Sequence, residues 1–156
     1  MHERFRYKTK EEILKKAEDL GLNLPFSDDI SPLLNPASFD RFSVLNRLVV
    51  QPMEGYDSEP DGSPSDLTKR RYLRYATGMS GIIWYEAVAV SHEGRSNPRQ
   101  IWISRNNFTS FSSLNEEVRK SAAHSGTVPF LVIQLTHSGR YSKPEGKSKP
   151  QVAEYY

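Results

Sequence analysis

Apolar and polar residues alternate along the chain in blocks that predict an α/β protein. Three short, nearly continuous apolar runs at 47–51, 81–90 and 128–135 are typical of strands buried on both faces. Between them, residues 66–77 are bounded by capping signals that predict a helix, and apolar residues that recur every three or four positions within 107–126 predict a second, amphipathic helix. The order is therefore strand, helix, strand, helix, strand. It favours a barrel-type fold whose chemistry collects at one set of strand ends.

Capping residues mark the ends of the expected helices. Ser65 is a suitable N-cap for the first barrel helix and Gly78 a suitable stop, and Asn107 is an N-cap for the second. Near the N-terminus, Thr9 and Glu12 have the spacing of a capping box, which predicts a further helix. Prolines then favour an irregular segment over 23–40.

The expected organisation has three parts. Residues 1–40 form a helix and loop extension, 41–142 a partial barrel, and 143–156 a loop rich in Lys, Pro, Ser and Gly. A closed eight-fold α/β barrel needs roughly 250 residues. With 156 residues and three strands, this chain supplies about three of eight βα units.

Composition excludes several classes of protein. The chain has no cysteine, which rules out disulfides and thiolate metal sites, and its four histidines lack metal-ligand spacing. No apolar run is long enough to cross a membrane, and no secretory signal is evident, so a cytoplasmic location is the default expectation. Net charge is only +2, and the basic cluster within 69–74 is interpreted as a solvated helix face rather than a nucleic-acid site.

Two polar residues at the predicted strand ends attract attention. His137 follows the third strand, where barrel sites collect side chains, and both a site-lining role and a structural hydrogen bond remain open. Glu86 lies in an apolar strand, where a carboxylate is expensive to bury unless it is paired. A structural ion pair is the expected role of Glu86, with Arg140 as a candidate partner.

Five segments, in order and with plausible spacing, resemble one known family. They are Asn46–Met53, Asp61–Pro64, Glu86–Arg95, Ile101–Trp102 and Gln134–Arg140. Together they are similar to the first three barrel strands, and the adjoining loops, of Old Yellow Enzyme-type NADH:flavin oxidoreductases. The resemblance covers about two thirds of the chain and implies part of a (β/α)8 TIM barrel.

The resemblance also implies a cofactor and its contacts. Members of that family bind FMN, are reduced by NAD(P)H and reduce an activated alkene or a related small-molecule acceptor. By position, Pro52 and Met53 would contact the isoalloxazine ring through their backbone, and Ala87 would let the ring approach the second strand. Gln134 would hydrogen-bond the pyrimidine edge, because an amide donates and accepts in one plane. Tyr56 would lie on the substrate side.

Glu54 departs from the family pattern, which has a small, hydroxyl or thiol residue after the methionine. An ionised carboxylate beside the ring disfavours reduced flavin, so Glu54 is expected either to tune the flavin or to turn toward solvent or a basic partner. The family's substrate-anchoring and proton-donating residues belong to later strands, so no catalytic residue is assigned here. The alternative is a catalytically silent partial barrel that associates with itself, or with a partner such as a missing C-terminal half.

Overall fold

The computed structural model describes residues 4–153, and its contacts divide the chain into two compact units, one up to Ile30 and one from Ser31 onward. The first unit contains helix α1 (Lys10–Asp19). Thr9 caps it as predicted, with its hydroxyl accepting a hydrogen bond from the Glu12 backbone N–H at 3.3 Å. The Glu12 carboxylate reaches back to the backbone N–H of Lys8 at 2.7 Å, one residue before the N-cap.

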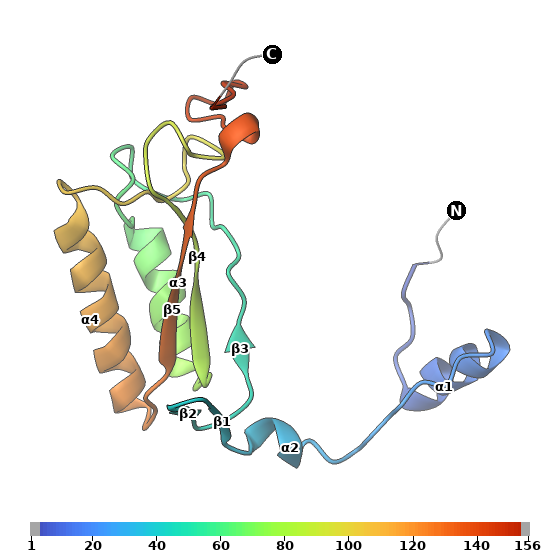
Figure 1. The fold of residues 1–156 in the computed structure, drawn as a ribbon. Coiled ribbons are helices and arrows are strands. Elements are labelled where there is room, and N and C mark those ends of the chain that lie inside the picture. The colour runs from blue at the N-terminus through green and yellow to red at the C-terminus, as the bar shows by residue number, and fades with distance from the viewer. Residues whose placement is uncertain (1–3, 154–156) are drawn as a thin grey trace. The chain divides into compact units, whose positions relative to one another are not determined.

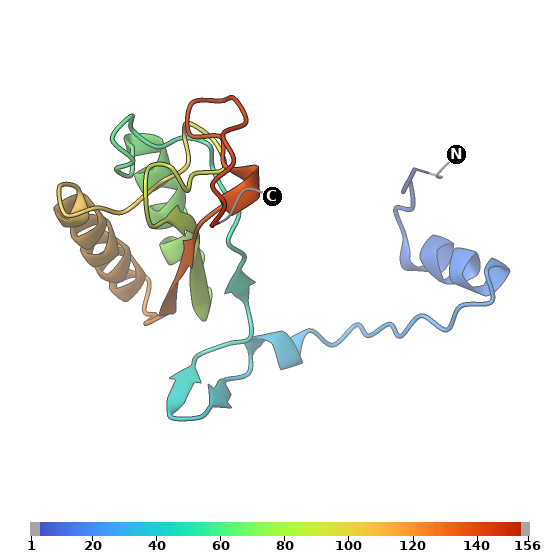
Figure 2. The ribbon, with the colours of Figure 1, turned by 45° about the horizontal axis from the view of Figure 1, so that its top comes forward.

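The second unit is built on a parallel three-stranded sheet in the order β3-β4-β5. Helices α3 and α4 lie on one face of this sheet (Figures 1 and 2). A right-handed strand–helix–strand crossover places successive helices on the same side, so this arrangement is the one that the alternating pattern predicts. Its elements are α2 (Ser31–Leu34), β1 (Ala37–Phe39), β2 (Phe42–Val44), β3 (Val49–Val50), α3 (Asp66–Thr77), β4 (Ile82–Ala89), α4 (Phe108–His124), β5 (Phe130–Thr136) and the 3-10 turn η1 (Gly139–Tyr141).

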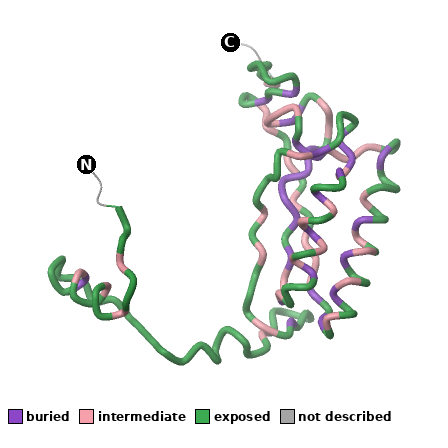
Figure 3. Tube along the Cα trace, turned by 180° about the vertical axis from the view of Figure 1, so that it is seen from behind, coloured by how far each residue is buried: buried purple, intermediate pink, exposed green. Residues whose placement is uncertain are grey.

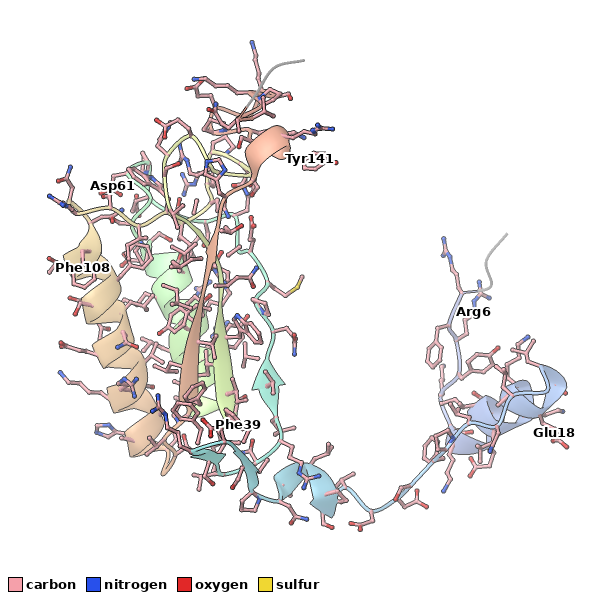
Figure 4. All side chains as sticks on the ribbon, in the orientation of Figure 1. Arg6, Glu18, Phe39, Asp61, Phe108 and Tyr141 are labelled. Carbon is pink, nitrogen blue, oxygen red and sulfur yellow. The ribbon has the colours of Figure 1, made fainter. Side chains whose placement is uncertain are left out.

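The irregular segment predicted over 23–40 is wrong in part, because it contains α2 and the first strand of the hairpin β1–β2. Two of its three prolines are compatible with these elements, since Pro32 lies in the first turn of α2 and Pro36 directly precedes β1. The aromatic rings of Phe39 and Phe42 pack against Phe130 with centroids 5.6 and 4.7 Å away. Phe39 therefore lies at the end of the sheet where β4 and β5 begin (Figure 4).

The register of β4 against β5 contains a bulge. Trp84 pairs with Val132 and Ala87 pairs with Gln134, so Tyr85 and Glu86 lie opposite the single residue between those partners. One extra residue in β4 shifts which side chains reach each face of the sheet. The bulge brings Ala87 beside Gln134.

The core lies between the sheet and its two helices (Figure 3). Tyr72 of α3 and Tyr85 of β4 stack with ring centroids 4.4 Å apart. On the exposed side of the two helices, Lys69 and Glu117 form an ion pair at 2.8 Å. The buried members of this core cluster are Tyr72, Ala76, Ile83, Tyr85, Leu114, Val118 and Ala122.

The two stacked tyrosines predict a loss of stability in alkali. Burial raises the pKa of Tyr85 to about 12, and burial together with the Glu86 charge raises the pKa of Tyr72 further above its usual value. The unfolded chain releases these protons first, so stability is complete below the unfolded pKa of about 10 and falls as pH rises above it. Urea unfolding between pH 8 and 11.5 should show a decline of about 1.4 kcal/mol per pH unit for each tyrosine.

Tyr85→Phe should reduce that alkaline slope, whereas Tyr141→Phe, which changes a ring that is 75% exposed, should leave it unchanged. An equal slope in both variants would contradict the assignment.

Candidate functional site

The candidate site lies at the carboxyl end of the sheet, where three polar segments meet. The loop 51–57 follows β3, the connection 90–107 follows β4, and the segment 137–141 follows β5 (Figure 1). The carboxyl ends of parallel barrel strands are where side chains from separate βα units converge. The structure therefore brings the predicted segments together at one end of the molecule.

Hydrogen bonds from β4 and α3 hold the loop after β3 in place. Its first turn is closed by a hydrogen bond from the Met53 N–H to the Gln51 carbonyl at 2.8 Å. The Gly55 N–H donates to a carboxylate oxygen of Glu86 at 2.9 Å, and Arg71 Nη1 donates to the Met53 carbonyl at 3.4 Å. The Met53 side chain is left 71% exposed above the loop. Strand β4 and helix α3 thus fix the backbone at the position predicted to contact a flavin.

Glu86 is the centre of this anchoring network. It is 1% exposed, and its carboxylate accepts hydrogen bonds from Arg71 Nη2 at 2.8 Å and from the Tyr72 hydroxyl at 3.3 Å. The same hydroxyl accepts the Glu86 backbone N–H at 2.7 Å. The predicted structural ion pair is confirmed, but the candidate partner was wrong. Arg140 lies on η1 with an exposed side chain, and Arg71 takes its place because α3 packs directly over β4.

Arg71 also binds Asp57 at 2.9 Å, so one guanidinium connects a carboxylate of the loop after β3 with the Glu86 carboxylate of strand β4. Burial alone would lower the pKa of Arg71, but the charge and hydrogen bond of Glu86, together with the charges of Tyr72 and Asp57, outweigh burial and raise that pKa above its usual range. The interpretation of the basic cluster as a solvated helix face was therefore wrong at Arg71, which turns inward, whereas Lys69 lies on the exposed side in its pair with Glu117.

Tyr56 lies next to this network with a positive φ of 56° and a side chain that is 58% exposed. It shares a groove with Arg70, Arg74 and Tyr75 of α3. The groove belongs to the flank of α3, so Tyr56 borders the site from the helix side of the loop.

Glu54 is hydrogen-bonded by side chains of the connection after β4. Its carboxylate accepts hydrogen bonds from Ser96 Oγ at 3.1 Å, Asn97 Nδ2 at 2.9 Å and Gln100 Nε2 at 3.3 Å. All three donors are neutral, so the described residues give Glu54 amide and hydroxyl partners rather than a basic one. The carboxylate is oriented by three side chains of one loop.

Gln100 connects the hydrogen bonds around Glu54 to strand β4. Its side chain is 1% exposed, and Nε2 also donates to the Ala87 carbonyl at 3.0 Å while Oε1 accepts the Ser96 N–H at 2.6 Å. A single buried amide therefore fixes the position of Glu54 relative to Ala87. Both Glu54 and Ala87 are predicted to line the same cofactor.

The same connection is tied to the C-terminal segment by Arg95, which is 3% exposed. Its guanidinium contacts His92 Nε2 at 2.6 Å and donates to the carbonyls of Pro98 and Pro144 at 2.9 and 3.2 Å. Burial lowers the pKa of Arg95. The first residues of the predicted loop 143–156 are therefore anchored to the connection 90–107 of the candidate site.

His137 packs against Gly94, where an added Cβ would lie 2.5 Å from the imidazole ring, so any larger residue at this position would displace the ring. The His137 Nδ1 accepts the Gly139 backbone N–H at 3.0 Å. This is the structural hydrogen bond that the sequence left open, and it places the mobile proton of a neutral ring on Nε2. His137 borders the site, and its Nε2 atom takes no part in the hydrogen bond with Gly139.

Ala87 and Gln134 face each other in register at the end of β4 and β5. Ala87 ends at a methyl group, and no hydrogen bond to the Gln134 side-chain amide occurs within residues 4–153. This pair suits a flat heterocycle. The ring could stack on the Ala87 methyl group, and its polar edge could hydrogen-bond the Gln134 amide, which has no other partner among the described residues. The residues present therefore fit FMN.

Sequence patterns missed the supporting residues Asp57, Arg71, Tyr72, Asn97 and Gln100. Three separate signals in the sequence could have been combined. The acidic loop after the first strand and Glu86 within an apolar strand both need a positive partner, and the basic helix offers one. The length of the connection 91–107 indicated function but not which side chains turn inward.

Two other kinds of site are absent from the part of the chain that the structure describes. No three His, Asp or Glu side chains gather as a metal-ion cluster between residues 4 and 153. No helix in the same range has the length and apolar character of a membrane span.

The parallel sheet, its two covering helices and the polar strand ends define part of a (β/α)8 barrel. Residues 32–155 match the model of the NADH:flavin oxidoreductase / NADH oxidase family, and the chain belongs to this family. FMN, with NAD(P)H as reductant, is the cofactor that this membership implies.

Curated relatives agree with this membership. The chain is 33% identical over 116 residues to the NADPH dehydrogenase of Bacillus subtilis, covering 73% of this chain and 32% of the relative. It is 34% identical over 109 residues to the NADPH dehydrogenase of Clostridium acetobutylicum, covering 69% of this chain and 30% of the relative. The chain thus spans about a third of the length of these relatives.

Solved structures show the same fold at low identity. The Old Yellow Enzyme from Pichia sp. superimposes with a TM-score of 0.62 at 20% identity, over 71% of this chain and 28% of that one. Morphinone reductase in complex with tetrahydroNAD superimposes with a TM-score of 0.56 at 24% identity, over 70% and 28%. The fold is therefore the N-terminal portion of an Old Yellow Enzyme-type barrel.

Proposed function

We propose that this chain forms the FMN-binding N-terminal part of an NAD(P)H-dependent oxidoreductase that reduces an activated alkene or a related acceptor. The observation that supports it most is the register pair Ala87 and Gln134, a methyl group beside an unpartnered amide at the carboxyl end of the sheet. FMN, when bound, supplies the hydride chemistry, and the protein supplies binding, orientation and electrostatics.

The proposed roles are those that the family resemblance implies, and the geometry is compatible with them. Gln134 hydrogen-bonds the pyrimidine edge, and Ala87 allows the ring to lie close to β4. Pro52 and Met53 line the ring from a loop that Glu86 holds in place. Glu54, oriented by its amide and hydroxyl donors, places a carboxylate near the ring and tunes the flavin potential.

The rest of the proposed site lies outside this chain. The relatives that it matches are about three times as long, so their later barrel strands have no counterpart here. Tyr56 and His137 are proposed on the substrate side, and no residue of this chain is proposed as the proton donor. A small-molecule acceptor would therefore be held largely by polypeptide that completes the barrel.

The test is an absorption spectrum of the chain after loading with FMN and desalting. We expect a retained flavin band, and we expect Gln134→Leu to weaken FMN binding by about tenfold to a hundredfold, because one or two hydrogen bonds are lost. Ile133→Ala, a neighbouring change on the opposite face of β5, is the control and should retain the band.

A colourless wild-type chain would count against FMN binding by these strand ends alone and would favour the silent partial barrel. Equal FMN affinity in wild type and Gln134→Leu would remove Gln134 from the site.

A further inference from the structure

The chain that follows η1 folds back onto the connection after β4 (Figure 1). We call residues 142–149 the strap, and it continues directly from the segment 137–141 of the candidate site. The Lys143 N–H donates to the Arg95 carbonyl at 2.8 Å, and Pro144 is almost completely buried. The strap is therefore packed against the site's connection rather than extended into solvent.

Arg95 links the strap to that connection through a buried cation. It is 3% exposed, and no carboxylate among residues 4–153 forms an ion pair with it. Its guanidinium donates instead to neutral acceptors, which are the carbonyls of Pro98 and Pro144 at 2.9 and 3.2 Å and Nε2 of His92 at 2.6 Å. A buried charge is unfavourable unless such partners compensate it, so Arg95 depends on each of them.

The contact between Arg95 and His92 fixes the protonation of the imidazole. A guanidinium only donates hydrogen bonds, so His92 Nε2 accepts one and carries no proton. The proton of the neutral ring is therefore on Nδ1. A second proton, on Nε2, would remove the acceptor and place two cations in direct contact. The arrangement in the structure consequently requires a neutral His92.

The carboxylates around this pair do little to offset a second cation. Glu93 interacts electrostatically with both His92 and Arg95, and Glu145 interacts with Arg95. Both carboxylates are exposed, where water and salt screen them, and both also interact with Lys149.

The other groups near His92 bring no negative charge. The rings of His92 and Trp102 meet edge to face with centroids 5.8 Å apart. From the end of β5, the His137 ring lies against Gly94. The strap itself has three lysines and one glutamate. Protonation of His92 would therefore add a positive charge where cations already outnumber carboxylates.

We propose that His92 is a proton-operated switch, which holds the strap on the connection when the imidazole is neutral and releases it when the imidazole is protonated. Histidine is the side chain that ordinarily changes charge within the pH range of cells. One guanidinium nitrogen, Nη2 of Arg95, donates both to His92 and to the Pro144 carbonyl. Repulsion that displaces the guanidinium from His92 therefore weakens its bond to the strap as well.

Release of the strap would reach the candidate site. The Gly139 carbonyl accepts hydrogen bonds from the Ser142 N–H at 3.1 Å and from the Gln151 N–H at 2.9 Å. These bonds hold the segment 137–141 at the carboxyl end of β5. The third segment of the site is thus fixed at neutral pH and loosened in acid, whichever molecule the site binds.

The test measures amide hydrogen exchange in the flavin-free chain by NMR at about pH 7.5 and about pH 5, with the intrinsic pH dependence of exchange removed. We expect the protection of the Lys143 N–H to fall by about tenfold or more in acid, because its bond to the Arg95 carbonyl opens to water. The Val90 N–H, which donates to the Thr136 carbonyl at 3.0 Å, is the internal reference and should keep its protection.

His92→Gln is the decisive variant, because its side-chain oxygen still accepts from Arg95 but takes up no proton in this range. It should hold the strap equally at both pH values. His124→Gln is the matched control, since His124 is exposed at the end of α4, and it should respond as the wild-type chain does.

Tryptophan fluorescence reports the protonation of His92 separately. Trp84→Phe leaves Trp102 as the only tryptophan, and a protonated imidazole in contact with an indole ring quenches its emission. We expect the emission to fall as the pH is lowered, and we expect this fall to disappear when His92→Gln is added.

Constant protection of Lys143 in the wild-type chain would overturn the proposal, whether or not His92→Gln folds. Quenching without loss of protection would also overturn it, because His92 would then take up a proton without releasing the strap. A response that persists in His92→Gln would assign the effect to another group, such as His137, and would equally contradict it. Because no flavin is present, none of these results bears on FMN binding.

Discussion

Glu86→Ala should lower the free energy of unfolding by about 3–5 kcal/mol, the usual cost of removing one partner of a buried ion pair. The change leaves Arg71 beside Asp57 alone, leaves the Tyr72 hydroxyl without its carboxylate, and frees the Gly55 N–H. Urea unfolding monitored by tryptophan fluorescence measures the effect.

The matched control is Glu117→Ala, which removes the same side chain from the partly exposed pair with Lys69. Surface pairs of this kind contribute about 0–1 kcal/mol, so the control should unfold almost as wild type does. Similar losses in the two variants would show that Glu86 is not the anchor of the loop.

Ala87→Leu should abolish FMN retention, with an increase in the dissociation constant of about a hundredfold or more. The added carbons would occupy the space beside Gln134 where the ring is proposed to stack, and overpacking of a close contact is strongly unfavourable. Fluorescence titration with FMN measures the dissociation constant, since flavin emission changes on binding.

Ala123→Leu is the control for this variant, because it makes the same change at an exposed position on α4. It should bind FMN as wild type does. If Ala87→Leu still bound FMN tightly and remained folded, the ring would have to lie elsewhere than over β4.

Local sequence signals were sufficient for the barrel elements. Helix α3 has the predicted bounds because Ser65 and Gly78 at its ends are chemically suited to capping, and the Ser65 hydroxyl does accept the Thr68 N–H at 3.2 Å. The predicted strands 47–51 and 81–90 contain β3 and β4, and the predicted strand 128–135 covers all of β5 except Thr136, since continuous apolar runs between turn residues leave few alternatives.

Long-range contacts explain what the sequence did not predict. The hairpin β1–β2 depends on the packing of Phe39 and Phe42 against Phe130, some ninety residues away. The direction of Arg71 is decided by two carboxylates on other elements, and neighbouring basic residues carry no mark that distinguishes it. The strand-end residues were located by resemblance, and their supporting shell became visible only in three dimensions.

The connection after β4 shows the same limit at one residue. Gln100 was an unremarked polar residue in a long loop, yet its buried amide reaches both Glu54 and the Ala87 carbonyl. The spacing between these three residues along the chain carries no periodic signal, since each lies on a different segment.

The bulge in β4 also bears on how the strand tolerates changes of length. Deleting Glu86 would restore a regular one-to-one ladder with β5, and the sheet itself would accept the shorter strand. The same deletion would remove the carboxylate that holds the loop after β3. Ladder regularity and loop anchoring are therefore opposed at this position, so a one-residue deletion could improve the strand only by releasing the neighbouring loop.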